Sequence, residues 1–326
     1  MSVAARQHQR GVALVTALLV VAIATVAAVA MANRQQLDIR RTGSLLHGEQ
    51  AWAYVLGAEN WAKVVLRRDA RESQIDSLAE DWSTQPPVSF VEGGSIVGRL
   101  IDLQGRFNVN NLVRGGSVDA DSLAFYKRLL QRLDIDERLA DALVDWIDAD
   151  INARFPDGAE DDAYLLLDPP YRAANRPLAD TSELRLVKGY EAEVVAKLLP
   201  HVSALPERTA LNVNTADATL LSVVAPGMTV AEGESLVEAR GEEPFDSVAK
   251  FMQEPALAGR TVASGTIGVT SNWFLMLSEA NIGQGRARLA STIQRSPNAL
   301  LVVRRQREFF DPVVPVSPQA ADNKTP

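Results

Sequence analysis

Cysteine is absent from the sequence and histidine is scarce, which removes several kinds of functional site. A chain without cysteine has no disulfide framework, thiolate metal site, iron–sulfur cluster or cysteine nucleophile. His8, His47 and His201 lie far apart, which disfavours histidine zinc sites and Ser-His-Asp catalysis. A P-loop, a G-x-S-x-G motif and a metalloprotease helix are also missing, so we do not expect an enzyme.

Positive charge is in short supply as well. Lys and Arg total 33 against 41 Asp and Glu, which gives a formal net charge of −8. This balance disfavours a general nucleic-acid binder, because such binding depends on neutralising phosphates. Hydrophobic residues make up 47% of the 326 residues, which is enough to build a core in one large domain or two ordinary ones.

The stretch from Val12 to Ala32 contains 21 residues without a charge. A helix of this length spans about 30 Å, the thickness of the hydrocarbon core of a bilayer. Arg6 and Arg10 precede it, so the positive-inside rule predicts a cytoplasmic N-terminus and places the chain after Asn33 outside. We therefore expect a single-pass anchor in an inner membrane, with the C-terminal region in the periplasm.

A cleaved secretory signal peptide is the first alternative for this stretch. Its apolar region would be about 7–15 residues long and would end at a site of small residues. Here the apolar run is longer and continues into a helical pattern from Arg34 to Arg68. An ordinary single-span anchor is the second alternative, and it stays open on this segment alone.

The start of the chain resembles the leader of type IV pilin-like proteins. The matching residues are Gln9-Arg10-Gly11, followed by Val12-Ala13-Leu14-Val15-Thr16. The resemblance implies that prepilin peptidase cuts between Gly11 and Val12, that the new amine of Val12 is methylated, and that the apolar run stays in the mature protein.

Two residues depart from the pilin-like pattern. The mature chain would begin with Val12 where the family usually has Phe, and Thr16 stands where it usually has Glu. In such filaments the glutamate offsets the N-terminal ammonium of the subunit ahead, and a buried carboxylate without that partner is costly. A subunit with nothing ahead of it has no ammonium to meet, and Thr16 avoids the cost.

The missing glutamate is typical of the K-type minor pseudopilins of type II secretion systems (the general secretion pathway protein K family), which this chain resembles. The resemblance implies a place at the pseudopilus tip, initiation of pseudopilus assembly, and support for the export of folded proteins across the outer membrane. It also implies partners of the I and J types, with the H type as a further candidate. The charge balance given above leads us to expect no nucleic-acid partner.

The pattern along the rest of the chain predicts strands on both sides of a helical block. A spine helix runs to about Asp69, a linker covers 82–87, and a hairpin follows at 88–102. Helical periodicity dominates 117–199 and 211–251, and strand-like alternation returns from Thr266, with further strands at 287–295 and 299–307. This order indicates one interrupted sheet with an inserted helical domain.

The expected fold class is therefore α+β, a pilin-like fold of a long N-terminal helix and an antiparallel sheet with a large inserted α-helical domain. The K-type family is similar in plan. The expected parts are a leader peptide (1–11), a transmembrane segment (12–32), a spine helix with the first strands (33–105), a helical domain with helix-hairpin-helix-like units (106–260), the remaining strands (261–310) and a disordered tail (311–326).

A weak internal repeat lies within the helical block. Residues 107–112 read FNVNNL and residues 211–216 read LNVNTA, and each copy precedes a helical unit. Asparagine side chains are suited to capping helix N-termini and starting turns. We interpret these asparagines as structural.

Residues 211–252 also resemble a helix-hairpin-helix module, which binds the DNA backbone through amides at a helix N-terminus. This makes a membrane-anchored, pilin-like DNA-uptake protein the alternative function. The hairpin Gly227-Met228-Thr229 has one glycine where such modules usually have two. Its surroundings are also acidic, with Arg240 opposed by these residues: Glu232, Glu234, Glu238, Glu242 and Glu243.

Acidic residues gather between Asp141 and Asp168, where nine carboxylates accompany one arginine. Asp145 and Asp148 lie on one helix face, and Asp148 and Asp150 fall at the end of that helix, where the helix dipole disfavours anions. Crowded oxygen ligands without Cys or His fit Ca²⁺ better than Mg²⁺, although the order of an EF-hand loop is absent. A solvated acidic loop is the alternative, and the carboxylates are too crowded for a glycosidase pair.

The motifs W-I-D-x-D and G-A-E-D in this segment resemble the K-type family, which implies a structural calcium site in the helical domain. The first candidate ligands are Asp148, Asp150, Glu160, Asp161 and Asp162. A second set of candidates contains Asp145, Asp168 and Asn175, the last through its side-chain carbonyl.

Overall fold

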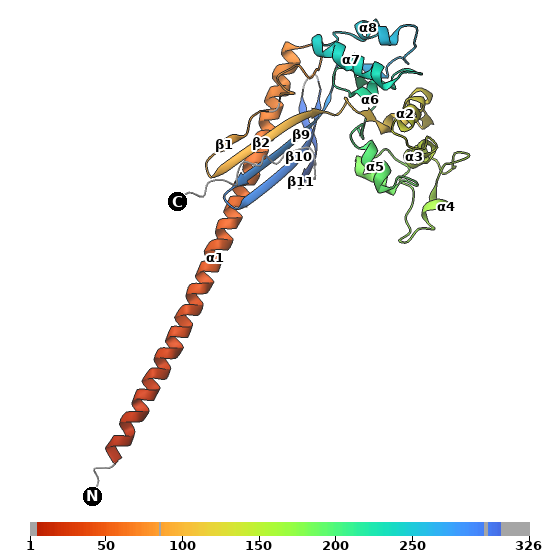
Figure 1. Ribbon diagram of the computed structural model, residues 1–326. Helices are drawn as coiled ribbons and strands as arrows, with labels where there is room; N and C mark the ends of the chain where they lie inside the picture. The colour runs from red at the N-terminus through yellow and green to blue at the C-terminus, as the bar shows by residue number, and fades with distance from the viewer. Residues whose placement is uncertain (1–4, 85, 297–298, 308–326) are drawn as a thin grey trace.

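The computed structural model describes residues 5–84, 86–296 and 299–307, with the backbone alone for residues 5–11 and Glu242. The tail expected at 311–326 and the first residues of the expected leader lie outside the described residues. A long helix, a sheet and a helical domain make up the described chain (Figure 1).

The long helix α1 runs without a break from Ala5 to Glu72. Its first half projects away from the rest of the molecule, and it is long and apolar enough to cross a membrane (Figure 1). Further along, Ala51, Val55, Ala62 and Leu66 are fully buried. Their spacing of four, seven and four residues places them on one face, so this stripe of α1 packs against the protein.

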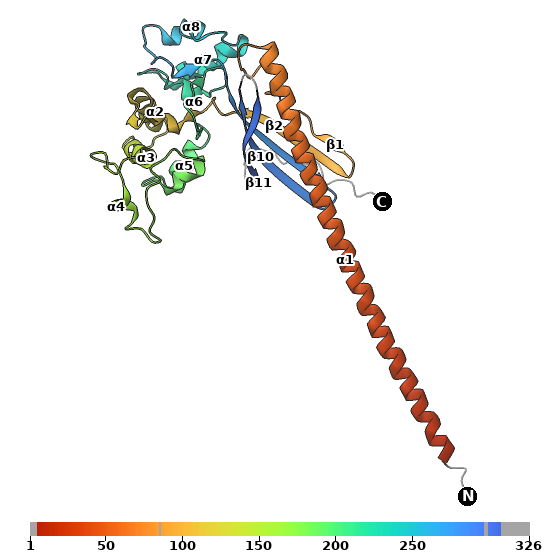
Figure 2. The same ribbon diagram turned by 180° about the vertical axis from the view of Figure 1, so that it is seen from behind.

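That stripe lies on one face of a five-stranded sheet (Figure 2). All neighbouring strands are antiparallel. The strand order is β1 (Ser89–Val91), β2 (Gly94–Asp102), β9 (Trp273–Ile282), β10 (Gly285–Arg295) and β11 (Leu300–Arg307). Strands β2 and β9 are neighbours although about half of the chain separates them, so the expected fold, with an insertion between two parts of one sheet, is confirmed.

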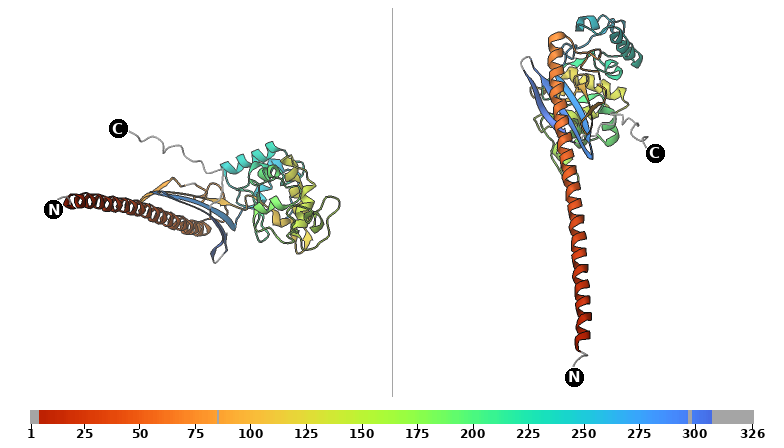
Figure 3. Two further views of the ribbon diagram at one scale, coloured as in Figure 1. Left: turned by 90° about the horizontal axis from the view of Figure 1, so that it is seen from below. Right: turned by 90° about the vertical axis from the view of Figure 1, so that its left-hand side faces the viewer.

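The insertion forms the helical domain, which lies beyond one end of the sheet and to the side of α1 (Figure 3). It contains the largest buried cluster of the described residues. Its helices are η1 (Val109–Leu112), α2 (Ala120–Arg132), α3 (Leu139–Ile147), α4 (Asp161–Tyr164), η2 (Thr181–Leu186), α5 (Ala192–Leu198), α6 (Ala218–Leu221), α7 (Val230–Glu242), α8 (Val248–Phe251) and η3 (Pro255–Leu257). Its short strands are β3 (Phe107–Asn108), β4 (Val113–Arg114), β5 (Ser117–Val118), β6 (Val202–Ser203), β7 (Leu211–Asn212) and β8 (Ile267–Gly268).

The sequence repeat marks two similar units within this domain. Strand β3 opens the first unit and pairs in parallel with β6, which closes it, and β7 pairs in the same way with β8. The side chain of Asn110 accepts the backbone N–H of Leu178 at 2.8 Å and donates to the carbonyl of the same residue at 2.9 Å. The side chain of Asn214 makes the same two hydrogen bonds with the backbone N–H and carbonyl of Phe245, each at 2.9 Å. Each asparagine thus ties a distant loop to the start of its unit, which confirms the structural interpretation.

Two local expectations differ from the structure. Trp82, expected in a linker, is 2% exposed and packs edge-on against Phe274 at 5.3 Å between ring centroids. Ile267, expected among the last strands of the sheet, pairs with β7 in the helical domain, and the main sheet resumes only at Trp273. Apolar alternation indicates a strand, but it carries no information about the strand's partner.

Candidate functional site

Carboxylate oxygens come together at two places among the described residues. One group contains Asp148, Asp150 and Glu160, and the other contains Asp69, Asp76 and Glu80. Within each group, one oxygen from each residue lies within 4.8 Å of the others. Each group contains two aspartates and one glutamate, but the groups differ in how their negative charges are compensated.

The first group is assembled around the end of α3. Asp148 is the residue that ends this helix, Asp150 follows on the exposed loop, and Glu160 immediately precedes α4. Asp148 is 7% exposed and Glu160 is 4% exposed. Two of the three carboxylates are therefore held away from solvent.

Asp145 folds the intervening loop back over α3. Its Oδ2 accepts the backbone N–H groups of Arg154 and Ala159 at 3.0 and 2.8 Å. A Cβ on Gly158 would lie 2.1 Å from the same oxygen, so the close approach of the loop requires glycine there. Asp145 thus positions the loop that brings Glu160 back to Asp148.

Several oxygens of this group are buried and have no hydrogen-bond partner among the described residues. They are Asp145 Oδ1, Asp148 Oδ1, both carboxylate oxygens of Glu160, and Asn175 Oδ1. Asn175 is tied to the group because its Nδ2 donates to the Asp150 carbonyl at 3.1 Å. Buried acceptors are costly unless a donor or a cation meets them, so this set of oxygens fits a hard cation.

Electrostatics give the same picture. Burial and the charges of Asp150 and Asp145 raise the pKa of Asp148 to about 6. Burial and the charges of Asp145, Asp148 and Asp150 raise the pKa of Glu160 to about 7. The guanidinium of Arg154, on the loop that follows α3, forms its ion pair with Asp141 at 3.3 Å. Within the described chain, the negative charge of the group is therefore poorly compensated.

The other residues expected as ligands lie outside this group. Asp161 Oδ1 accepts the Ala173 N–H at 3.0 Å, and its Oδ2 is 3.7 Å from Arg172. Asp162 is exposed and accepts the adjacent Ala163 N–H at 2.8 Å. Asp168 is also exposed. The structure therefore brings together Asp148, Asp150 and Glu160 of the first set, and Asp145 and Asn175 of the second.

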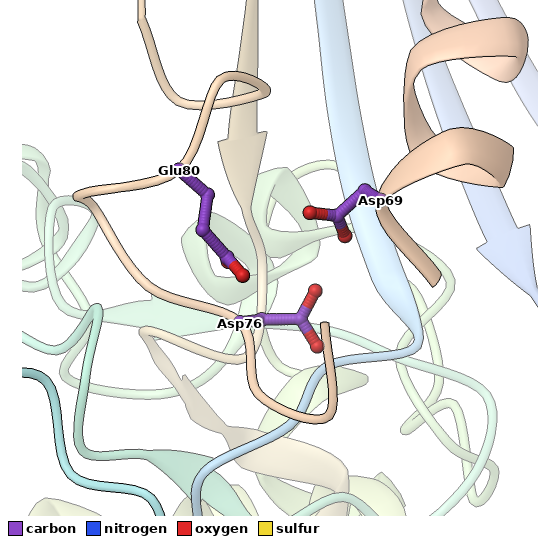
Figure 4. A group of neighbouring side chains, drawn as sticks. All are labelled: Asp69, Asp76 and Glu80. Atoms are coloured by element: carbon purple, nitrogen blue, oxygen red, sulfur yellow. The ribbon is translucent and has the colours of Figure 1, made fainter. Parts of the chain in front are cut away.

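The second group is drawn in Figure 4, and a guanidinium compensates it. Arg295 lies 2.8 Å from Asp69 and 2.5 Å from Asp76. Glu80 accepts hydrogen bonds from the Ser77 N–H and the Trp82 Nε1, at 2.7 and 3.0 Å. Each carboxylate has a partner, so this group is a structural ion-pair network and does not need a cation.

The hairpin that resembles a DNA-binding module has a blocked helix terminus. Thr229 caps α7 by accepting the Glu232 N–H at 3.2 Å, and Glu232 accepts the Thr229 N–H at 2.7 Å. A carboxylate therefore occupies the end of the helix at which a phosphate would bind. Met228, at the centre of the hairpin, is 4% exposed.

The hydroxyl of Thr16 makes its hydrogen bond within α1. Its Oγ1 donates to the Ala13 carbonyl at 3.0 Å, and its side chain is otherwise exposed. A hydroxyl bonded in this way needs no partner from another subunit, whereas a carboxylate at this position would. Gly11 and Val12, where cleavage is expected, lie on the same helix.

Comparison with known proteins gives a consistent result. Two family models, both described as type II secretion system (T2SS), protein K, match residues 105–207 and 211–270, the two units of the helical domain. The type II secretion system protein K of Pseudomonas aeruginosa is 42% identical over 312 residues, covering 91% of this chain and 92% of that protein. The protein K of Klebsiella pneumoniae is 34% identical over 319 residues, covering 93% of this chain and 98% of that protein.

A solved structure extends the similarity to the fold. A chain in the crystal structure of the GspK–GspI–GspJ complex from the type 2 secretion system of enterotoxigenic Escherichia coli superposes with a TM-score of 0.71. That chain is 30% identical, and the match covers 83% of the present chain and all of that one. The present chain thus matches protein K relatives in sequence, and a solved structure in fold, over most of its own length. It belongs to the protein K family of the type II secretion system.

Proposed function

We propose that the chain is a minor pseudopilin at the tip of the type II secretion pseudopilus, where it initiates assembly and supports export of folded proteins across the outer membrane. The observation that carries this proposal is Thr16, whose hydroxyl is satisfied within its own helix. A subunit that lacks an acid at this position can end a filament without an uncompensated buried charge. The helical domain, which projects to the side of α1, favours the same position (Figure 3).

The membrane arrangement follows from the charge-free run of α1. Residues 12–32 cross the inner membrane, and the sheet and helical domain lie in the periplasm. Prepilin peptidase cleaves between Gly11 and Val12, and the amine of Val12 is then methylated. N-terminal sequencing of the membrane-bound protein is expected to start at Val12. A start near Asn33 would contradict both the processing and the tip assignment.

The partners proposed for this tip are the I-type and J-type minor pseudopilins, because the similar solved chain is in a complex with GspI and GspJ. The H type is a further candidate. Co-expression of the full-length chain with its I and J counterparts is expected to yield a complex that co-purifies in detergent. Recovery of this chain without them, together with a shift of duplex DNA in a mobility assay, would instead favour the DNA-uptake alternative.

The substitution Thr16→Glu tests the tip position directly. We expect it to reduce secretion strongly or to admit the subunit into the filament shaft, because an unpaired buried carboxylate costs several kcal/mol. Secreted enzyme activity in the medium of a complemented deletion strain measures the effect. Thr16→Ser keeps the hydroxyl and serves as the control. Secretion by Thr16→Glu equal to that of Thr16→Ser would remove the argument from this residue.

We also propose that the first acidic group holds a structural calcium ion. The oxygens of Asp145, Asp148, Asp150, Glu160 and Asn175 are the ligands that the geometry supports. A bound Ca²⁺ supplies positive charge and accepts several oxygens at once, so it links the end of α3 to the loop that follows. Asp161, Asp162 and Asp168 lie outside the group and are not needed for this role.

A further inference from the structure

Three arginines follow the membrane-spanning run of α1 within a short distance. They are Arg34, Arg40 and Arg41, and all three are exposed. Ala51 is the first buried residue of α1 after the run, so the segment that carries the arginines projects between the membrane and the folded domains (Figure 1). The arginines therefore take no part in the packing of α1 against the sheet.

This segment carries positive charge that is only weakly compensated. Residues 33–48 contain the three arginines and one acidic residue, Asp38. Arg41 lies 3.9 Å from Asp38, and both side chains are exposed, so this ion pair is weak. Arg34 and Arg40 form no ion pair within the part of the chain that the structure describes. The segment thus presents net positive charge to its surroundings.

The position of the arginines along α1 matches the headgroup layer of a bilayer. Residues 12–32 fill the hydrocarbon core, and the headgroup layer extends about 5–8 Å beyond that core on each side. At about 1.5 Å per residue, Arg34 lies about 3 Å beyond the core and Arg41 about 14 Å. Side chains of an α-helix lean toward its N-terminus, which is the membrane end of α1. The long side chains of Arg40 and Arg41 can therefore reach back toward the headgroups.

The arginines are distributed around the helix. Arg34 and Arg41 are seven residues apart and lie on one face, whereas Arg40 is turned by about 100° from Arg41. A protein partner contacts one face of an isolated helix, but lipids meet it from every side. A band of positive charge around α1 therefore fits a layer of phosphates better than it fits a single acidic protein surface.

We propose that Arg34, Arg40 and Arg41 form a band that binds the phosphates of anionic phospholipids in the outer leaflet of the inner membrane. The inference rests on the membrane arrangement proposed above. Because Arg6 and Arg10 leave with the leader, the band contains the arginines nearest to the bilayer in the mature chain. It fixes the depth of the helix, and the subunit must release these lipids when it leaves the membrane for the pseudopilus.

Lipid selectivity at the outer end of the membrane helix tests the band. The chain has no cysteine, so Asn33→Cys places a single fluorophore next to Arg34 in the full-length protein. The labelled protein is reconstituted into phosphatidylcholine vesicles that contain an equal fraction of nitroxide-labelled phosphatidylglycerol or nitroxide-labelled phosphatidylcholine. From the quenching, we expect an association constant about fivefold larger for phosphatidylglycerol, which falls toward equality at about 1 M salt because the Debye length is then about 3 Å. Strong and equal quenching by the two lipids would overturn the proposal.

Charge variants within the band give opposite expected results. Combined Arg34→Gln, Arg40→Gln and Arg41→Gln are expected to make the two association constants equal. These side chains are exposed, so their replacement leaves the packing of α1 unchanged. Asp38→Asn removes the one negative charge of the segment and is expected to increase the selectivity. Unchanged selectivity in both variants would contradict the band.

Arg67→Gln combined with Arg71→Gln is the matched control. Both are exposed arginines of α1, and they lie about 40 Å or more farther from the bilayer than the band. We expect the selectivity of this variant to equal that of the unmodified band, and a loss of selectivity would count against the proposal. Absence of quenching by either lipid would contradict the membrane arrangement itself, so the failure of that arrangement and the failure of the band are distinguishable.

Discussion

Removing calcium with a chelator is expected to lower the melting temperature of the full-length protein in detergent by about 5–10 °C. The reference is a sample in which the free calcium concentration is about one hundred times the dissociation constant. The physical reason is that several buried oxygens around Asp148 and Glu160 have no other partner among the described residues. An ion that binds the folded form alone stabilises it by about 2.7 kcal/mol at this excess. Differential scanning calorimetry measures the shift, and magnesium at the same concentration is expected to give a smaller one.

Variants of single carboxylates make this test specific to the proposed site. Asp148→Asn and Glu160→Gln are expected to abolish most of the calcium-dependent shift. Asp162→Asn is the matched control, because Asp162 is acidic and close in sequence but exposed and outside the group. Equal melting temperatures with calcium and with chelator would contradict the calcium site and would leave the tip assignment untouched.

The second large effect is expected from Asn214→Ala, which should lower the free energy of unfolding by about 2–4 kcal/mol. Asn214 is 1% exposed, and its removal leaves the N–H and C=O of Phe245 buried without partners. Urea unfolding followed by tryptophan fluorescence measures the loss. Asn110→Ala, at the matching position of the first unit, is expected to cost less because Asn110 is partly exposed.

Asn281→Ala provides the control for this comparison. Asn281 is an exposed asparagine of β9 that bonds the side chain of Glu279. We expect its replacement to change stability by less than about 0.5 kcal/mol. An Asn214→Ala variant as stable as Asn281→Ala would show that the hydrogen bonds of Asn214 to Phe245 do not stabilise the second unit.

The parts of the fold that depend on local pattern could be predicted from the sequence. The charge-free run from Val12 to Ala32 predicts the projecting half of α1, and alternating residues predict β9, β10 and β11. The inserted position of the helical domain also follows, because strands flank it on both sides in the chain. These features are set by periodicity over many residues, which needs no knowledge of distant contacts.

The parts that depend on distant contacts could not be predicted in the same way. Trp82 follows a polar turn and precedes prolines, which indicates a linker, yet Phe274 of β9 covers it. Similarly, seven carboxylates and one amide were candidates for the acidic site, and their spacing did not distinguish them. The hydrogen bonds of Asp145 to the loop, and of Asn175 to Asp150, select the members.

The unbroken course of α1 has a mechanical consequence. The helix has no interruption from Ala5 to Glu72, and the sheet is attached to it between Ala51 and Leu66. The helical domain lies to one side of the axis of α1 (Figure 3), so the molecule is not symmetric about that axis. A turn of the membrane end about its own axis carries the offset domain along an arc. Rotation at the base is thereby converted into a sideways sweep at the far end.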